Sequence, residues 1–194
     1  MIKIGLTGGM ASGKSSVAKA LREEGIPIFD ADACAHELTE QGGAALPVIA
    51  RELGQQLVVN GVMDRQAVAE LVFHNAEAKK HLETILHSMI WEHAEAFFKK
   101  HAAAPAVVLD VPLLIETGWN KRVDEVWLVY IPVEEQIRRV MIRDGMTREH
   151  ALARLATQMT TEEKKPYADV VIDNSGTLEQ TLTRLAGEIK RIKG

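Results

Sequence analysis

The chain has 194 residues, enough for one α/β domain with a sizeable insertion, and its hydrophobic fraction of 46% is ordinary for a globular protein. Its net charge of −4 and its lack of a basic block argue against nucleic acid as a partner, and no apolar run approaches the length of a membrane span. A single cysteine, Cys34, excludes an intramolecular disulfide and fits a reducing compartment, so we expect a cytoplasmic protein.

The N-terminal apolar run, Met1–Leu6, is followed by a complete G-x-x-x-x-G-K-S motif at residues 8–15. A helical pattern begins at Lys14, so the motif lies between a strand and a helix, as a phosphate-binding loop requires. Lys14 would contact the β- and γ-phosphates of ATP, and Ser15 would bind Mg²⁺. The predicted nucleotide-binding residues are Gly8, Gly9, Met10, Ala11, Ser12, Gly13, Lys14, Ser15 and Ser16.

Short Val- and Ile-rich runs alternate with helical patterns along the chain, which predicts an α/β fold with a five-stranded parallel sheet flanked by helices. The expected strands are Lys3–Thr7, Pro27–Asp30, Ala106–Asp110, Glu125–Tyr130 and Asp169–Asp173. Helices are expected at Lys14–Glu24, Val133–Arg143, Thr147–Met159 and Thr177–Ile192.

The stretch from about residue 33 to 101 contains no convincing strand and reads as a helical insertion. Asp64 can cap a helix that runs toward Phe73, and apolar residues from Leu82 to Phe97 recur at helical spacing. The insertion either holds a phosphoryl acceptor or only shields the sheet. The expected organisation is a core of residues 1–32, 104–132 and 160–194, an acceptor-binding insertion of 33–103 and a lid of 133–159.

Two carboxylates follow the second strand, where ligands bind in such sheets. Asp32 is the candidate that orients an acceptor hydroxyl and takes its proton, whereas Asp30 is interpreted as the N-cap of the next helix. Asp110 and Glu116, after the third strand, either belong to a Mg²⁺ site or are structural. The histidines show no metal-ligand spacing, so Mg²⁺ that arrives with ATP is the one metal expected.

The predicted helix from Val133 carries Arg138, Arg139 and Arg143. Arg139 and Arg143 are four residues apart and share a face, from which they could close over the transferring phosphate and neutralise its charge. The alternative is a solvated basic face that pairs with Glu134 and Glu135.

The chain resembles the dephospho-coenzyme A kinase family over nearly its whole length. The ordered matches are Leu6–Ser15, Asp30-Ala-Asp32, Gly61, Asp64-Arg65, Phe73, His87, Ile90, Val111–Leu114, Glu116, Gln136, Arg139, Arg143, Gln158, Lys164, Ala168-Asp169 and Ile172–Gly176. Ala11, where the family usually has glycine, and Ser88, where proline is common, depart from the pattern.

The resemblance implies an NMP-kinase-like P-loop fold and transfer of the γ-phosphate of ATP to the ribose 3′-hydroxyl of dephospho-coenzyme A. It places Asp32 and His36 at the acceptor and Arg139 and Arg143 at the transferring phosphate. Three further residues, Leu113, Leu114 and Gln158, would border the acceptor, and Asn174 would lie near the adenine. The protein is expected to be a monomer or weak homo-oligomer without membrane or nucleic-acid partners.

Two other functions fit parts of the pattern. A shikimate- or gluconate-type kinase also has an acid after the second strand, but its acceptor region is generally shorter. A nucleotide-sensing module would bind ATP without acceptor-dependent turnover. A GTPase is disfavoured because Asn120-Lys121-Arg122-Val123-Asp124 misplaces the acid of the guanine-binding motif by one residue.

Overall fold

The computed structural model describes all residues from 1 to 194. The chain divides into two compact units, one formed by Met1–Phe29 together with His101–Gly194, and the other by Asp30–Lys100. Each unit is described by itself below. No helix has both the length and the apolar character that crossing a membrane requires.

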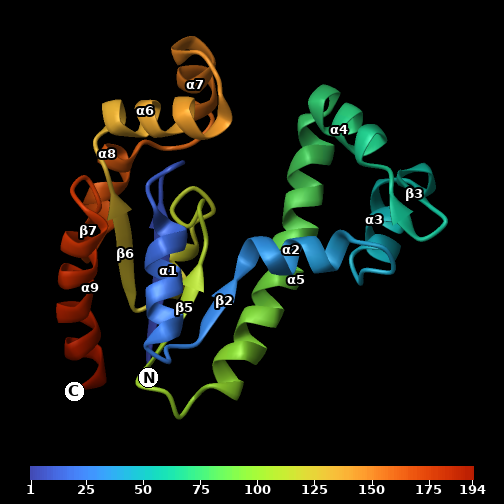
Figure 1. Ribbon diagram of the computed structural model, residues 1–194. Helices are drawn as coiled ribbons and strands as arrows, with labels where there is room; N and C mark the ends of the chain where they lie inside the picture. Colours follow the sequence, from blue (N-terminus) through green and yellow to red (C-terminus); the bar gives the residue numbers. More distant parts are fainter. The chain divides into compact units, whose positions relative to one another are not determined.

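The five-stranded sheet has the order β2-β5-β1-β6-β7 (Figure 1). Its strands are β1 (Ile2–Gly8), β2 (Ile28–Asp30), β5 (Ala106–Asp110), β6 (Glu125–Tyr130) and β7 (Val170–Asp173). β1 pairs in parallel with β5 and β6, and β6 pairs in parallel with β7. The predicted parallel α/β sheet is therefore confirmed, and its strands differ from the expected ranges by at most one residue at an end.

Central strands of this sheet are apolar on both faces because helices cover them. The unit contains α1 (Lys14–Glu23), α6 (Val133–Asp144), α7 (Arg148–Leu155), α8 (Thr161–Lys164) and α9 (Leu178–Lys193), with the short 3₁₀ turns η2 (Trp119–Arg122) and η3 (Lys165–Tyr167). Helices α1 and α9 contact each other, and β6 points toward the end of the sheet at which α6 and α7 lie (Figure 1). The main core includes Ile4, Leu6, Val17, Leu21, Val108, Trp127, Val129 and Leu185.

The helix expected over Thr147–Met159 is shorter in the structure, where α7 ends at Leu155. The next residues tighten into i→i+3 hydrogen bonds, such as Gln158 N–H to the Leu155 carbonyl, which close a helix end. Thr160 then adopts an extended conformation and starts α8 through a capping box with Glu163. The apolar spacing continues across this break, so it did not indicate that a new helix starts there. The Thr160–Glu163 pair is the sequence signal for that start.

The second unit is mainly helical and contains α2 (Ala31–Thr39), α3 (Leu46–Leu53), η1 (Gln55–Leu57), α4 (Arg65–His74) and α5 (Ala76–Lys100). Helix α5 contacts α2, α3 and α4, so it forms the centre of this unit. Asp64 caps α4 by accepting hydrogen bonds from the N–H groups of Gln66 and Ala67, which confirms the predicted start of that helix.

The expectation that this region lacks strands was wrong in one place. A short antiparallel hairpin joins β3 (Val58–Val59) to β4 (Val62–Met63). Its turn residues Asn60 and Gly61 have φ angles of 53° and 74°. Asn-Gly is the preferred pair for a tight hairpin turn because both residues tolerate positive φ. The sequence signal was present, but the strands are too short to show an alternating pattern.

Candidate active site

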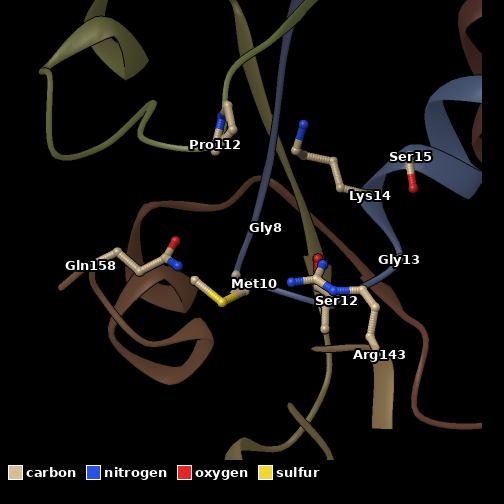
Figure 2. Close-up of a pocket in the computed structure, with 11 residues that line it drawn as sticks. Gly8, Met10, Ser12, Gly13, Lys14, Ser15, Pro112, Arg143 and Gln158 are labelled. Carbon is tan, nitrogen blue, oxygen red and sulfur yellow. The ribbon is translucent and has the colours of Figure 1, made fainter. Parts of the chain in front are cut away.

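The predicted phosphate-binding loop connects β1 to α1 and forms the wall of a pocket of about 310 Å³. The pocket is lined by residues 8–15 together with Pro112, Arg143 and Gln158, so segments far apart in the sequence meet there (Figure 2). Ser16 lies in the first turn of α1, outside the pocket lining, and its predicted contact with nucleotide stays a prediction.

Two buried carboxamides hold the loop from behind. The Gln136 side chain donates to the Met10 carbonyl at 3.0 Å, and the Asn174 side chain donates to the Ser12 carbonyl at 2.7 Å. The Asn174 oxygen in turn accepts from the Thr181 hydroxyl at 2.8 Å. Because these carbonyls are occupied by side-chain donors, the loop is fixed before a nucleotide binds, and its N–H groups are pre-organised for phosphate.

The loop glycines are needed where these amides approach. A Cβ atom at Gly9 would lie 2.1 Å from the Gln136 side-chain nitrogen, and one at Gly13 would lie 2.1 Å from that of Asn174. Gly13 also has a φ of 87°, which L side chains rarely adopt. Ala11 keeps its Cβ at a φ of 56°, so the departure noted in the sequence is accommodated in the left-handed region at an energetic cost of about 1 kcal/mol.

Lys14 and Asp110 form an ion pair beside the loop. Lys14 was predicted from the motif, and the structure adds its partner at the carboxyl end of β5, which is the sheet position expected for a Walker-B acid. The pair keeps the Lys14 ammonium at the pocket, where it can turn to phosphate oxygens when they are present. The ion pair places Asp110 beside a pocket-lining lysine, and its participation in a Mg²⁺ site stays a prediction.

No group of three or more His, Cys, Asp or Glu side chains forms a metal cluster. The Ser15 hydroxyl lines the pocket, and the Asp110 carboxylate is paired with Lys14, which also lines it. These hard oxygen donors suit Mg²⁺, an ion that usually takes one or two protein oxygens and completes its shell with phosphate and water. The residues present therefore fit a Mg²⁺ ion that enters with the nucleotide rather than one bound by the protein alone.

The arginines of α6 have different surroundings. Arg143 lines the pocket and pairs with Asp144 at 2.7 Å. Arg139 donates to the Asn174 carbonyl at 2.9 Å, and its guanidinium lies 4.0 Å from a Cβ built on Gly13, so it borders the loop. It also pairs with Glu135, as does Arg138, which points to solvent. Hydrogen bonds from Arg138 and Arg139 lower the pKa of Glu135 to about 2.

The α6–α7 pair rests directly on the loop. Its small core of Ile137, Val140, Ala151 and Leu155 packs against Met10 and Ala11. The basic-face interpretation thus holds for Arg138. Arg139 also pairs with Glu135 but borders the loop, and Arg143 lines the pocket, so their predicted contacts with phosphate stay predictions.

The segment after β5 contains three residues singled out in the sequence, Leu113, Leu114 and Glu116. The Leu114 side chain is fully buried, and a Cβ on Gly5 would collide with it, so it supports the sheet and cannot border a ligand. Leu113, in contrast, is 42% exposed. Glu116 pairs with Lys164 at 3.1 Å and accepts from the Met159 N–H at 3.1 Å. These contacts favour the structural interpretation of Glu116.

The acceptor-side candidates Asp30, Asp32 and His36 lie at the start of the second unit. Asp30 ends β2 and caps α2 by accepting from the Ala33 N–H at 3.0 Å, as predicted. Asp32, in the first turn, and His36 are both exposed. Because they are four residues apart on α2, they share one face. Their predicted roles at an acceptor stay predictions.

Three supporting residues escaped the analysis of spacing and composition. Gln136, Thr161 and Lys164 are almost completely buried, yet each lies in a short polar stretch that resembles an exposed helix face. Thr161 donates to the Ile131 carbonyl at 2.7 Å and anchors α8 on the end of β6. No local signal identifies such residues, because their partners come from distant segments.

A G-x-x-x-x-G-K-S loop on a parallel sheet, with Lys14 and Arg143 at one pocket, defines a P-loop nucleotide-binding protein. A family model described as Dephospho-CoA kinase matches residues 2–180. The chain therefore belongs to the dephospho-CoA kinase family.

Individual relatives agree with the family model. The dephospho-CoA kinase of Symbiobacterium thermophilum is 45% identical over 183 residues, which cover 92% of this chain and 76% of the relative. That of Carboxydothermus hydrogenoformans is 40% identical over 193 residues, covering 98% and 94%. The solved structure of TT1252 from Thermus thermophilus is 39% identical, with a TM-score of 0.81 over 100% of this chain and 98% of that one.

Proposed function

We propose that this chain transfers the γ-phosphate of ATP to the ribose 3′-hydroxyl of dephospho-coenzyme A, which is the last step of coenzyme A biosynthesis. Family membership supports the kinase activity and both substrates. The observation that carries the proposal in the structure is the pocket in which the complete phosphate loop, Lys14 and Arg143 converge.

On the donor side, the loop N–H groups would hold the phosphates of ATP, and Lys14 would exchange part of its contact with Asp110 for the β- and γ-phosphates. Ser15, with Asp110 through water, would hold Mg²⁺, which neutralises phosphate charge. Arg139 and Arg143 would meet the charge that develops on the transferring group. We also propose that residues 133–159 act as a lid, since α6 and α7 pack on Met10 and Ala11 of the loop.

On the acceptor side, Asp32 would orient the ribose hydroxyl and accept its proton, with His36 on the same helix face. Leu113 is exposed and Gln158 lines the phosphate pocket, so both are available to contact the acceptor. We assign acceptor binding to residues 33–103 because this insertion is far longer than the connections usual in α/β units. Asn174 near the adenine, a monomeric or weakly oligomeric state, a cytoplasmic location and the absence of membrane or nucleic-acid partners stay predictions.

The first test is ADP release by purified protein with Mg²⁺-ATP, measured with and without dephospho-coenzyme A. We expect release that depends on this acceptor, with coenzyme A as the product identified by mass spectrometry. Lys14→Met should abolish turnover because the phosphates lose their ammonium partner, and it serves as the control for contaminating kinases. Turnover with shikimate or gluconate instead would indicate another small-metabolite kinase, and ATP binding without acceptor-dependent turnover would indicate a sensing module.

A further inference from the structure

Lys164, the last residue of α8, has a side chain with 0% exposure, which is unusual for a lysine. Removing an ammonium group from water costs several kcal/mol unless the group is paired and hydrogen-bonded. The pairing is present, because the ammonium donates to the Pro112 carbonyl at 2.7 Å and lies 3.1 Å from the Glu116 carboxylate. The proposed chemistry uses neither Lys164 nor Glu116, so the burial of this lysine needs another explanation.

The two partners of Lys164 lead to two different walls of the phosphate pocket. Pro112 itself lines the pocket, and its carbonyl also accepts from the Thr7 hydroxyl at 2.9 Å. Glu116 accepts from the Met159 N–H, and the neighbouring Gln158 lines the pocket. One ammonium group thus connects the segment after β5 with the segment that ends the proposed lid.

The base of this connection is rigid. Helix α8 begins with the reciprocal capping box between Thr160 and Glu163, and Thr161 anchors it on the Ile131 carbonyl. Lys164 therefore extends from a fixed helix toward two segments that carry no regular secondary structure at Pro112 and Gln158. Because the ammonium donor is fixed and buried, its contacts limit the movement of the two irregular segments more than contacts between exposed side chains would.

We propose that Lys164 is a positioning residue for phosphoryl transfer, which together with Glu116 fixes Pro112 and Gln158 on either side of the phosphate-binding loop. This inference rests on the proposed function for its catalytic consequence. A misplacement of reacting groups by about 1 Å can reduce turnover by about a hundredfold, so a contact that sets the spacing of two pocket walls matters for rate.

The electrostatics agree with this location. Burial lowers the pKa of Lys164, the hydrogen bond with Glu116 opposes that shift, and the positive charge of Lys14 adds to it. The two ammonium groups are thus close enough to interact. Glu116 keeps the second cation in place without leaving its charge uncompensated beside Lys14.

The test compares Lys164→Met with Lys193→Met, which removes a lysine with similar contacts whose side chain is 39% exposed. Lys193 makes the same types of contact, to the Glu24 carbonyl at 2.8 Å and its carboxylate at 2.9 Å, but it lies outside the phosphate pocket. For each variant, kcat, both KM values, the Kd for ATP and the melting temperature would be measured. We expect Lys164→Met to lower kcat by about tenfold or more at temperatures at which it is folded, and Lys193→Met to change it by less than about twofold.

Glu116→Gln provides a second variant that keeps the shape and the acceptor for Met159. Its melting temperature should fall, because the buried Lys164 ammonium loses its charged partner, and its kcat should fall by about fivefold. The double variant with Lys164→Met should be little worse than Lys164→Met alone, since the two side chains act as a unit. These comparisons separate positioning from stability, because a merely structural pair would shift the melting temperature without changing kcat.

Folded Lys164→Met with wild-type kcat would overturn the proposal. If that variant does not fold, unchanged kcat in Glu116→Gln would overturn it instead. Failure of the proposed function shows separately, as absence of dephospho-coenzyme A turnover by the wild type. In that case the Kd for ATP would test whether Lys164 positions the pocket walls. This Kd should rise by about threefold or more in Lys164→Met, and an unchanged Kd would refute the positioning role.

Discussion

Replacing Asn174 with alanine tests whether the phosphate-binding loop is held in place by side chains behind it. In the native structure the Asn174 amide donates to the Ser12 carbonyl at 2.7 Å and accepts from Thr181 at 2.8 Å. The orientation of the amide is determined by these partners, because a carbonyl can only accept and must face the nitrogen. The variant removes both interactions, and Asn174 itself is not among the residues that line the pocket.

The cost can be worked out from the contacts. The Ser12 carbonyl loses its donor at a cost of about 1–3 kcal/mol, and the void left by a side chain that is only 7% exposed adds about 1 kcal/mol. Thr181 adds little, because its hydroxyl also reaches the carbonyls of Asp173 and Thr177 at 3.3 and 3.2 Å. The free energy of unfolding should therefore fall by about 2–4 kcal/mol, which lowers Tm by about 6–12 °C for a chain of this size.

Asn174→Asp sharpens the test because it keeps the volume of the side chain. It places a carboxylate oxygen against the Ser12 carbonyl, so two acceptors face each other in a buried site. We expect it to be at least as destabilising as Asn174→Ala and to weaken ATP binding. Asn120→Ala, a half-buried asparagine outside this network, is the control.

Unfolding would be followed by circular dichroism in urea and on heating, and ATP affinity by calorimetry. If both Asn174 variants unfold within about 0.5 kcal/mol of the wild type and bind ATP normally, the loop does not depend on this amide and the reasoning is refuted.

Asp32→Asn should retain ATP binding while kcat falls by about 10²-fold, the usual scale for loss of a general base. Asp30→Asn should retain activity, because asparagine caps a helix as well as aspartate does. A larger effect at Asp30 than at Asp32 in steady-state kinetics would reverse the two roles. Arg139→Ala should reduce kcat more than ATP affinity. Arg138→Ala, the control, loses the same glutamate partner on the same helix and should change neither quantity. If Arg139→Ala weakens only ATP binding, Arg139 is a ground-state contact. Burial, with a smaller contribution from Glu37, raises the pKa of the Cys34 thiol from 9.0 to about 11. At pH 8 the thiolate fraction in the folded protein is therefore about a hundredfold lower than in the unfolded protein. Alkylation of the native protein should be slower than alkylation in urea by at least that factor. The same shift means that the unfolded state releases the proton first, so stability present below about pH 9 should decline as the pH rises toward 11, and a Cys34→Ala variant should lack that decline.

Local patterns predicted the elements of the fold well because each has its own signal. Val- and Ile-rich runs gave the five strands, Asp64 marked a helix start, and the glycines of the loop marked the turn after β1. The prediction failed where a signal was shorter than the pattern used to detect it. The two-residue strands around Asn60-Gly61 and the four-residue helix α8 are such cases.

The direction in which side chains point was less predictable. Adjacent residues Leu113 and Leu114 look equivalent in the sequence, yet one is exposed and the other packs under Gly5. Glu116 looks like a metal-binding acid until Lys164, which is distant in the sequence, is placed against it. Each of these outcomes depends on a partner in another segment, which spacing along the chain does not identify.

The sequence by itself determined the sheet, the phosphate-binding loop and two basic residues that line its pocket, Lys14 and Arg143. Those features follow from residue type, glycine conformation and local periodicity. Tertiary structure alone decided what supports the loop, through Gln136 and Asn174, and what pairs with Lys164. The physical reason is that burying an amide or an ammonium group is favourable only when a specific distant carbonyl or carboxylate meets it, and folding is what brings those groups together.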